Sequence, residues 1–255
     1  MYDLTHLSLQ NITDIGINLR GISQEADSLE TVANRCTKFF YENLRDETTG
    51  DSACVLARFF RTQNYETLPE FIQAQARKAI GATAAEEDTR LGKVKCLTLL
   101  ATQGEKAEWC DRKLSQGHQT IPLTNEQAVN QIPMISQLIK DLGLEINSVV
   151  APDPDLLLTL EQKTCNVFHI PTALGSQFIP AQTDFVEPYG VKSVLGFGGM
   201  LPSGNLFAVI LFTKSAIPAK TARLFKSLPL SIKMAMIPFD NTSPFAAVTP
   251  CEPSL

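Results

Sequence analysis

Hydrophobic residues recur at intervals of three and four in four stretches of the chain, which is the period of an amphipathic helix. Ser23 and Asn125 precede two of these stretches as expected N-caps, and Gly143 follows one of them as an expected helix end. Pro229 lies inside the last stretch and is expected to kink or split that helix. The predicted helices are residues 25–45, 68–81, 125–143 and 219–237, and a further short helix is expected within 152–164.

Five compact apolar stretches rich in β-branched and aromatic residues predict strands. The last two flank Pro202-Ser203-Gly204, where proline fixes φ and glycine can take a positive φ, so we expect a hairpin. The polar stretch 82–93 and most of 172–190 predict loops. The predicted strands are residues 51–62, 94–104, 165–171, 193–201 and 205–215.

Gly196, Gly198 and Gly199 raise the question whether this hairpin binds phosphate. A dinucleotide-binding fingerprint needs a third glycine and a helix that begins directly after it. Leu201 stands where that third glycine is needed, and a turn and a second strand follow. We therefore expect these glycines to allow a bulge or a close approach of backbones within the sheet.

Composition and charge narrow the function classes. The chain has 255 residues, a formal net charge of −5 and a pI of about 5.3, with no cluster of Lys and Arg, which argues against a nucleic-acid partner. No stretch is long and apolar enough to cross a membrane, and the first residues lack a signal-peptide pattern, so we expect a cytoplasmic protein with no membrane partner. The six cysteines contain no CxxC pair, which favours reduced core residues over disulfides or a zinc site.

The order helix, strand, strand, insertion, strand, hairpin, helix resembles that of GAF domains, the ligand-sensing modules of many signalling proteins. This resemblance implies an α+β fold in which a five- or six-stranded antiparallel sheet has helices on both faces. It divides the chain into an N-terminal segment (1–24), a single GAF-like domain (25–240) and a tail or linker (241–255). The resemblance is most specific in VFHIPTALGSQFIP (167–180), YGVKSVLGFGGMLPSGNLFAVILFTKS (189–215) and IPAKTARLFKSLPLSIKMAM (217–236).

An enlarged insertion, residues 104–164, separates the second and third core strands in this scheme. The family's ligand lies between one sheet face and the elements that join strands two to four. The resemblance therefore implies a pocket roofed by residues 105–164 and 172–189, while the first and last helices pack together on the other face.

The chain also resembles the N-terminal sensory regions of bacterial PAS-containing histidine kinases, in which a GAF-like unit ends in Pro-Phe, here Pro238-Phe239. This resemblance implies a two-component sensor that binds an unidentified small molecule non-covalently. Such a sensor relays occupancy through the terminal helices of a homodimer to a downstream PAS or histidine kinase module. The first alternative is a dimerisation or scaffold domain without a ligand.

The sequence EWCDRK at residues 108–113 is a candidate ligand-binding cluster. Trp109 offers a stacking surface, and Asp111 and Arg112 offer charge-assisted hydrogen bonds. An aromatic wall with a few polar groups is typical of small-molecule pockets, so these three residues are candidate ligand contacts. The alternative is a surface loop that its tryptophan anchors to the core.

Arg58, His118 and His169 complete the candidate ligand contacts. Arg58 is expected on a strand with Leu56 and Phe60 on the same face, so it either contacts a ligand or extends along the surface to solvent. His118 lies in the expected roof and His169 ends a predicted strand. Imidazole can bind a ligand or ligate haem, whereas a loop histidine is often only solvated.

No catalytic motif stands out, so we expect no enzyme and no metal. The Cys-His pair and the Asp-x-Cys-Phe motif, through which some relatives attach a bilin, are missing from the sequence. Haem stays open as a cofactor. Cys96 and Cys110 leave a second alternative function, a cysteine-dependent reductase of the GAF fold.

Overall fold

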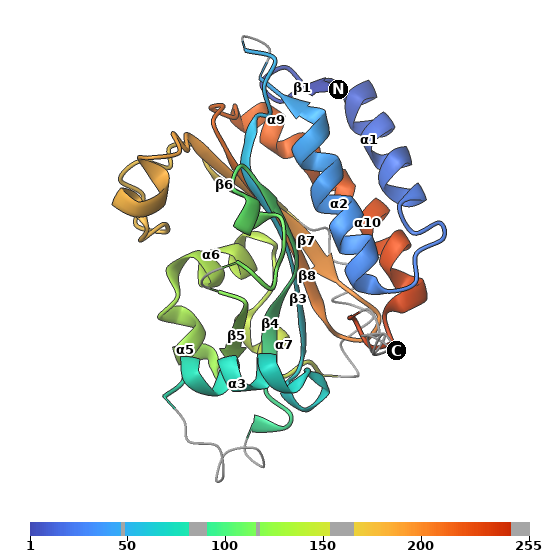
Figure 1. Ribbon diagram of the computed structural model, residues 1–255, viewed down its shortest axis with the longest axis vertical. Coiled ribbons are helices and arrows are strands. Elements are labelled where there is room, and N and C mark those ends of the chain that lie inside the picture. The colour runs from blue at the N-terminus through green and yellow to red at the C-terminus, as the bar shows by residue number, and fades with distance from the viewer. Residues whose placement is uncertain (47–48, 82–90, 116–117, 154–165, 246–255) are drawn as a thin grey trace, which may run out of the picture.

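The computed structural model of the chain describes residues 1–46, 49–81, 91–115, 118–153 and 166–245. In these residues, helices cover both faces of a six-stranded antiparallel sheet (Figure 1). The predicted α+β fold class is therefore confirmed. None of the helices in the described ranges is both long and apolar enough to cross a lipid bilayer.

The sheet has the strand order β5-β4-β3-β8-β7-β6, and every neighbouring pair is antiparallel. β3 lies in the middle, and nearly all of its side chains are buried because both faces of the sheet are covered. A separate two-stranded parallel pair joins β1 (Tyr2–Asp3) to β2 (Leu44–Arg45). The bounds of the main sheet are β3 Cys54–Asn64, β4 Lys95–Gly104, β5 Thr120–Leu123, β6 Phe168–Ile170, β7 Ser193–Met200 and β8 Leu206–Thr213.

β7 and β8 form the expected hairpin, and its turn places Gly204 at a φ of +75°. A Cβ on Gly198 would lie 2.0 Å from the carbonyl oxygen of Phe207, so only glycine fits beside the backbone of β8. A Cβ on Gly196 would lie 2.8 Å from Cδ1 of Leu138, in the layer above the sheet. The glycines serve close packing, as predicted.

One face of the sheet, here called the helical face, is covered by four helices (blue and red in Figure 1). Their apolar sides and the facing strand residues form a continuous core that includes Phe40, Phe59, Phe197 and Phe225. The helices are α1 Leu9–Gly21, α2 Leu29–Asn43, α9 Ala219–Leu224 and α10 Leu228–Met236.

α2 begins later than predicted, because its N-cap is Ser28 and not Ser23. The Ser28 hydroxyl accepts a hydrogen bond from the Thr31 N–H at 3.2 Å. The preceding turn is held by Arg35, which donates to the carbonyl oxygens of Ile22 and Gln24. These bonds tie the turn before Ser28 to α2.

The N-terminal segment contributes α1, a helix that the sequence analysis did not predict. Ser8 and Asn11 form a capping box at its start. Ile12, Ile15 and Leu19 are buried on its inner side, where α1 packs against α10. The segment that was set apart from the domain therefore shares the domain's core.

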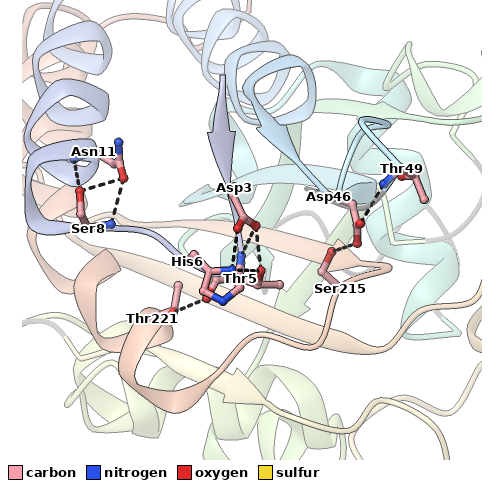
Figure 2. A network of polar contacts seen from close by, with 9 residues as sticks. All are labelled: Asp3, Thr5, His6, Ser8, Asn11, Asp46, Thr49, Ser215 and Thr221. Carbon is pink, nitrogen blue, oxygen red and sulfur yellow. Dashed lines mark hydrogen bonds and ion pairs between the residues drawn. The ribbon is translucent and has the colours of Figure 1, made fainter.

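Polar contacts hold the residues before α1 and the chain after β2, as Figure 2 shows. Thr5 donates to the carboxylate of Asp3 from its backbone N–H and its hydroxyl. The Thr221 hydroxyl in α9 donates to the Thr5 carbonyl oxygen at 3.2 Å, and the Ser215 hydroxyl donates to Asp46 at 2.9 Å. The first residues are thus bonded to the last helical region.

The last predicted helix is split, as Pro229 indicated. α9 ends at Leu224, a 3₁₀ turn η5 (Phe225–Ser227) follows, and Pro229 lies in the first turn of α10, where its missing N–H costs no hydrogen bond. A second 3₁₀ turn, η6 (Ile237–Phe239), leads to Asp240.

The opposite face, here called the roofed face, is covered by short elements (green to gold in Figure 1). The segment between β6 and β7 is mostly irregular, with one π-helical turn, as the loop prediction expected. The short elements of this face are η2 Ala107–Trp109, α5 Glu126–Asn130, α6 Pro133–Asp141, α7 Ile146–Val150 and η4 Gln182–Val186. The turn η1 Tyr65–Thr67 and the helix α3 Glu70–Ala79 instead place Tyr65, Ile72 and Ala76 in the core of the helical face.

Two predictions between β4 and β6 were wrong. The helix expected over 125–143 is two helices. The residue before Pro133 avoids helical backbone, so α5 ends at Asn130 and α6 begins at Pro133. The expected insertion at 104–164 contains a strand, β5, which pairs with β4. In chain order, β6 is therefore the fourth strand of the main sheet and not the third. The helix expected within 152–164 falls mostly outside the described residues.

Candidate functional site

A cavity of about 540 Å³ lies between the roofed face of the sheet and the elements above it. Its floor is formed by residues of the two central strands, Leu56, Arg58 and Phe60 of β3 and Ile210 and Phe212 of β8. Its roof comes from three segments, which are 106–109, 131–135 and 178–185. Both predicted roof regions, 105–164 and 172–189, thus contribute to it.

The roof leaves space because it is built from short pieces. α5 and α7 have five residues each, and the chain from 171 to 192 has a single helical turn. Such pieces cannot align a long apolar stripe with the sheet, as α2 does on the helical face. The cavity is therefore a consequence of the irregular segments that the sequence contains in this region.

Arg58 is the charged group on the floor of the cavity. It lies on the same face of β3 as Leu56 and Phe60, as strand alternation predicted. Its Nη2 donates to the Ser115 hydroxyl at 2.9 Å, while its Nε is buried without a hydrogen-bond partner. No carboxylate of the described residues pairs with it, and burial lowers the pKa of this guanidinium to about 10.

Trp109 forms part of an aromatic wall of the cavity. Its ring makes edge contacts with Phe185, at 5.6 Å between centroids, and with Tyr189, at 4.8 Å. Phe185 in turn contacts Phe212 of the floor at 5.1 Å. The Lys106 ammonium lies over both the Trp109 and Tyr189 rings. These contacts join two separate roof segments to the sheet.

His118 lies at the edge of the cavity on a left-handed backbone, with a φ of +52°. Desolvation, and then the positive charge of Arg58, lower the pKa of its imidazole. The side chain is therefore neutral near pH 7. It also borders a second hollow of about 1100 Å³ between α3 and β5, whose walls are mostly exposed or half-buried side chains.

Arg58, Trp109 and His118 are thus brought together at one cavity, but the other three sequence candidates are not part of it. Asp111 is exposed, and its carboxylate accepts the backbone N–H of Lys113 in a local turn. His169 points to the helical face near Ile217, where burial lowers its pKa and its Nε2 has no hydrogen-bond partner.

Arg112 is buried away from the cavity. Its Nε donates to a carboxylate oxygen of Glu30 at 2.5 Å, and its guanidinium lies 4.3 Å from the Phe245 ring centroid and 5.8 Å from that of Phe71. These partners come from α2, α3 and the chain after α10. Arg112 therefore joins distant parts of the fold and does not face the space where a ligand fits.

Sequence reasoning missed several residues of the site. Ser115, which holds Arg58, has no local signal that distinguishes it from other loop serines. Phe178 and Phe185 did carry a signal, because large aromatic residues in a polar loop indicate that the loop covers apolar surface.

The thiols of Cys96 and Cys110 do not form a pair. Cys96 is buried near the start of β4, and burial raises its pKa to about 12. Cys110 is exposed, and its Sγ donates to the carbonyl oxygen of Gly104 at the other end of that strand. Eight residues of strand separate these positions by roughly 25 Å. In the described ranges, no three His, Cys, Asp or Glu side chains cluster as a metal site either.

The chain matches no protein-family model, and a search of curated proteins finds no match. The site is therefore interpreted from its own geometry.

Proposed function

We propose that the chain is a GAF-like sensory module that binds a small molecule in the cavity over β3 and β8. The observation that carries this proposal is an apolar cavity of about 540 Å³ with one desolvated cation on its floor. Pockets of roughly 300–1,000 Å³ with apolar walls and a few polar groups are typical of small-molecule sites. The position of the cavity, beneath both predicted roof segments, also fits the GAF resemblance.

The same loop that contacts the cavity also contacts the helical face. Ser115 accepts a hydrogen bond from Arg58, and Arg112, three residues earlier, pairs with Glu30 in the first turn of α2. A ligand that draws Arg58 away from Ser115 would shift the position of this loop. Through the pair of Arg112 and Glu30, it would also shift the position of α2. Occupancy can shift the helices only if the ligand binds their two arrangements with different affinity.

We propose the exposed side of α1 and α10 as the homodimer interface through which the signal leaves the domain. The two helices pack together, and each presents apolar side chains at helical spacing. Such a surface is typical of protein–protein contacts. A downstream PAS or histidine kinase module and a cytoplasmic location belong to the same proposal. The exposed residues are Leu9 and Ile17 of α1, Leu230 and Met234 of α10, and Ile237 of the following turn η6.

Native mass spectrometry of the freshly purified chain tests the sensor function. We expect a dimer that carries a reproducible non-covalent adduct. A bare dimer, whose cavity also takes up no small molecule in a thermal-shift screen, would support the scaffold alternative instead. A bare monomer would contradict the relay.

A matched pair of variants tests the interface. Met234→Lys places a charge on α10 and should give monomers, because an unpaired charge in an apolar contact is costly. Leu174→Lys changes another exposed apolar residue, outside these helices, and should leave the dimer intact. Equal behaviour of the two variants would argue against this interface.

A further inference from the structure

We propose that the ligand of the cavity is a monoanion with a flat apolar body, whose carboxylate pairs with Arg58. This inference rests on the proposed function and names its ligand class. Three features of the cavity carry it, which are a guanidinium without a carboxylate partner, the charge balance at the rim and the aromatic and aliphatic side chains of the walls.

The guanidinium of Arg58 has N–H donors without a partner in the described residues. Arginine carries five N–H donors in a planar fork that matches a carboxylate. In the described residues the side chain of Arg58 makes one hydrogen bond, from Nη2 to Ser115, and its Nε–H has no partner. Thr102, directly opposite Arg58 on β4, is also buried with an unpaired hydroxyl. A carboxylate beside Nε would satisfy the buried donor and supply the missing negative charge.

The charge balance at the rim favours a single negative charge. Lys106 and Glu108 lie 3.6 Å apart and offset each other. The exposed carboxylate of Asp184 adds a further negative charge, and His118 is neutral near pH 7. Arg58 is thus the sole inward cation of the described lining without a nearby acid. A polyphosphate would meet Asp184 and Glu108 with no further cation to hold it.

The walls favour a flat hydrocarbon body. Phe60 and Phe212 lie on the floor, Trp109 and Phe185 form one wall, and the start of α6 adds aliphatic side chains. Aromatic rings arranged in this way contact a planar ligand by stacking and edge contacts. An aromatic monocarboxylate therefore satisfies the charged floor and the apolar walls together.

The test compares 2-naphthoate with 2-naphthamide, which have the same shape and differ in charge. Trp109, the single tryptophan of the chain, reports binding by its fluorescence, and calorimetry gives the affinity. We expect naphthoate to bind at least about tenfold more tightly than the amide, since hydrogen bonds between charged groups are stronger than those to a neutral amide.

Variants of Arg58 show whether this preference has the proposed source. Arg58→Gln should abolish the preference, and Arg58→Lys should keep part of it, because lysine retains the charge but not the fork. Arg223→Gln removes an exposed arginine from α9 and should leave both affinities unchanged. A preference that survives in Arg58→Gln would overturn the inference.

A second measurement does not depend on the probe. Arg58→Met replaces a desolvated cation by an apolar side chain of similar length, so we expect the melting temperature of the unliganded protein to rise by about 2–4 °C. A large fall would show that Arg58 is a structural residue. Equal binding of both naphthyl probes would refute the charge requirement and leave the proposed function standing. If neither probe binds at millimolar concentration, the inference of a flat aromatic monoanion fails, whereas the proposed function fails only if native mass spectrometry and the thermal-shift screen also find no ligand.

Discussion

β3 carries two arginines, three residues apart, that point to opposite faces of the sheet; Arg61 is buried and Arg58 is half-buried. Arg61 lies on the helical face, where its Nη2 meets the Asp240 carboxylate at 2.7 Å and both side chains are almost fully buried. Arg58 lies on the roofed face beneath the cavity, with a hydroxyl as its described partner. One strand thus presents the same chemistry in two contrasting environments.

The contrast separates a structural charge from one that is available for binding. The Arg61 ion pair is supported by Ser203, whose backbone N–H and hydroxyl both donate to Asp240, so the carboxylate accepts three hydrogen bonds. Buried charges usually have such partners, because desolvation of an isolated charge is costly. A cation that lacks them beside an open space indicates that its partner comes from outside the fold.

The largest effect is expected when the paired arginine loses its acid. Asp240→Asn leaves Arg61 charged and unpaired in the core, which should lower the free energy of unfolding by about 3–5 kcal/mol. Urea denaturation measures this loss, with Arg58→Met as the control on the other face. A similar loss of stability in Asp240→Asn and Arg58→Met would contradict the contrast between the two arginines.

A second pair of variants compares how readily the atoms around Gly198 and Gly196 can shift to admit a Cβ. Gly198→Ala places a Cβ against the backbone of β8, which cannot yield, so we expect a loss of about 2–3 kcal/mol. Gly196→Ala meets the side chains of Leu138 in the roof and of Phe168 on the neighbouring strand β6, which can shift, so its cost should be about 1 kcal/mol. Equal costs in urea denaturation would mean that the roof is as rigid as the sheet.

A third prediction concerns Arg112, which the sequence analysis placed at the ligand. Arg112→Met removes the partner of Glu30 and the contact with Phe245, so we expect a loss of about 2 kcal/mol in the free energy of unfolding. The affinity for 2-naphthoate should change by less than about threefold. A larger loss of affinity by calorimetry would restore Arg112 as a ligand contact.

The smallest effect is a pH dependence. The lowered pKa values of His118 and His169 mean that the unfolded chain binds protons on these imidazoles at higher pH than the folded chain. Stability should therefore be complete above the usual histidine pKa and fall as the pH drops from about 7 to 5. His169→Leu should reduce this fall by about 1 kcal/mol or less, as measured by urea denaturation at both pH values. An unchanged fall would assign it to other groups.

Local patterns predicted much of the fold. The β7–β8 hairpin, the split at Pro229 and the face of Arg58 depend on residues close in sequence, and the structure agrees with each. α1 also had a local signal, the Ser8–Asn11 box before Ile12, Ile15 and Leu19, that the sequence analysis did not use. β5 was missed because it has four residues and contains a proline, and its partner β4 decides its state.

Half of the candidate site could not be predicted, because the deciding partners are distant in sequence. Glu30 lies 82 residues from Arg112, and Ser115 lies 57 residues from Arg58. The type of residue showed that each arginine needs an acceptor. Only the fold shows which acceptor it has.

The two arginines of β3 also bear on how the chain finds its strand pairing. Since they are an odd number of residues apart, a slip of β3 by one residue would exchange their faces. Arg58 would then enter the helical core out of line with Asp240, while Arg61 would lose its carboxylate. Both errors make the misaligned sheet less stable than the native one. The two arginines therefore favour the native register of β3 during folding.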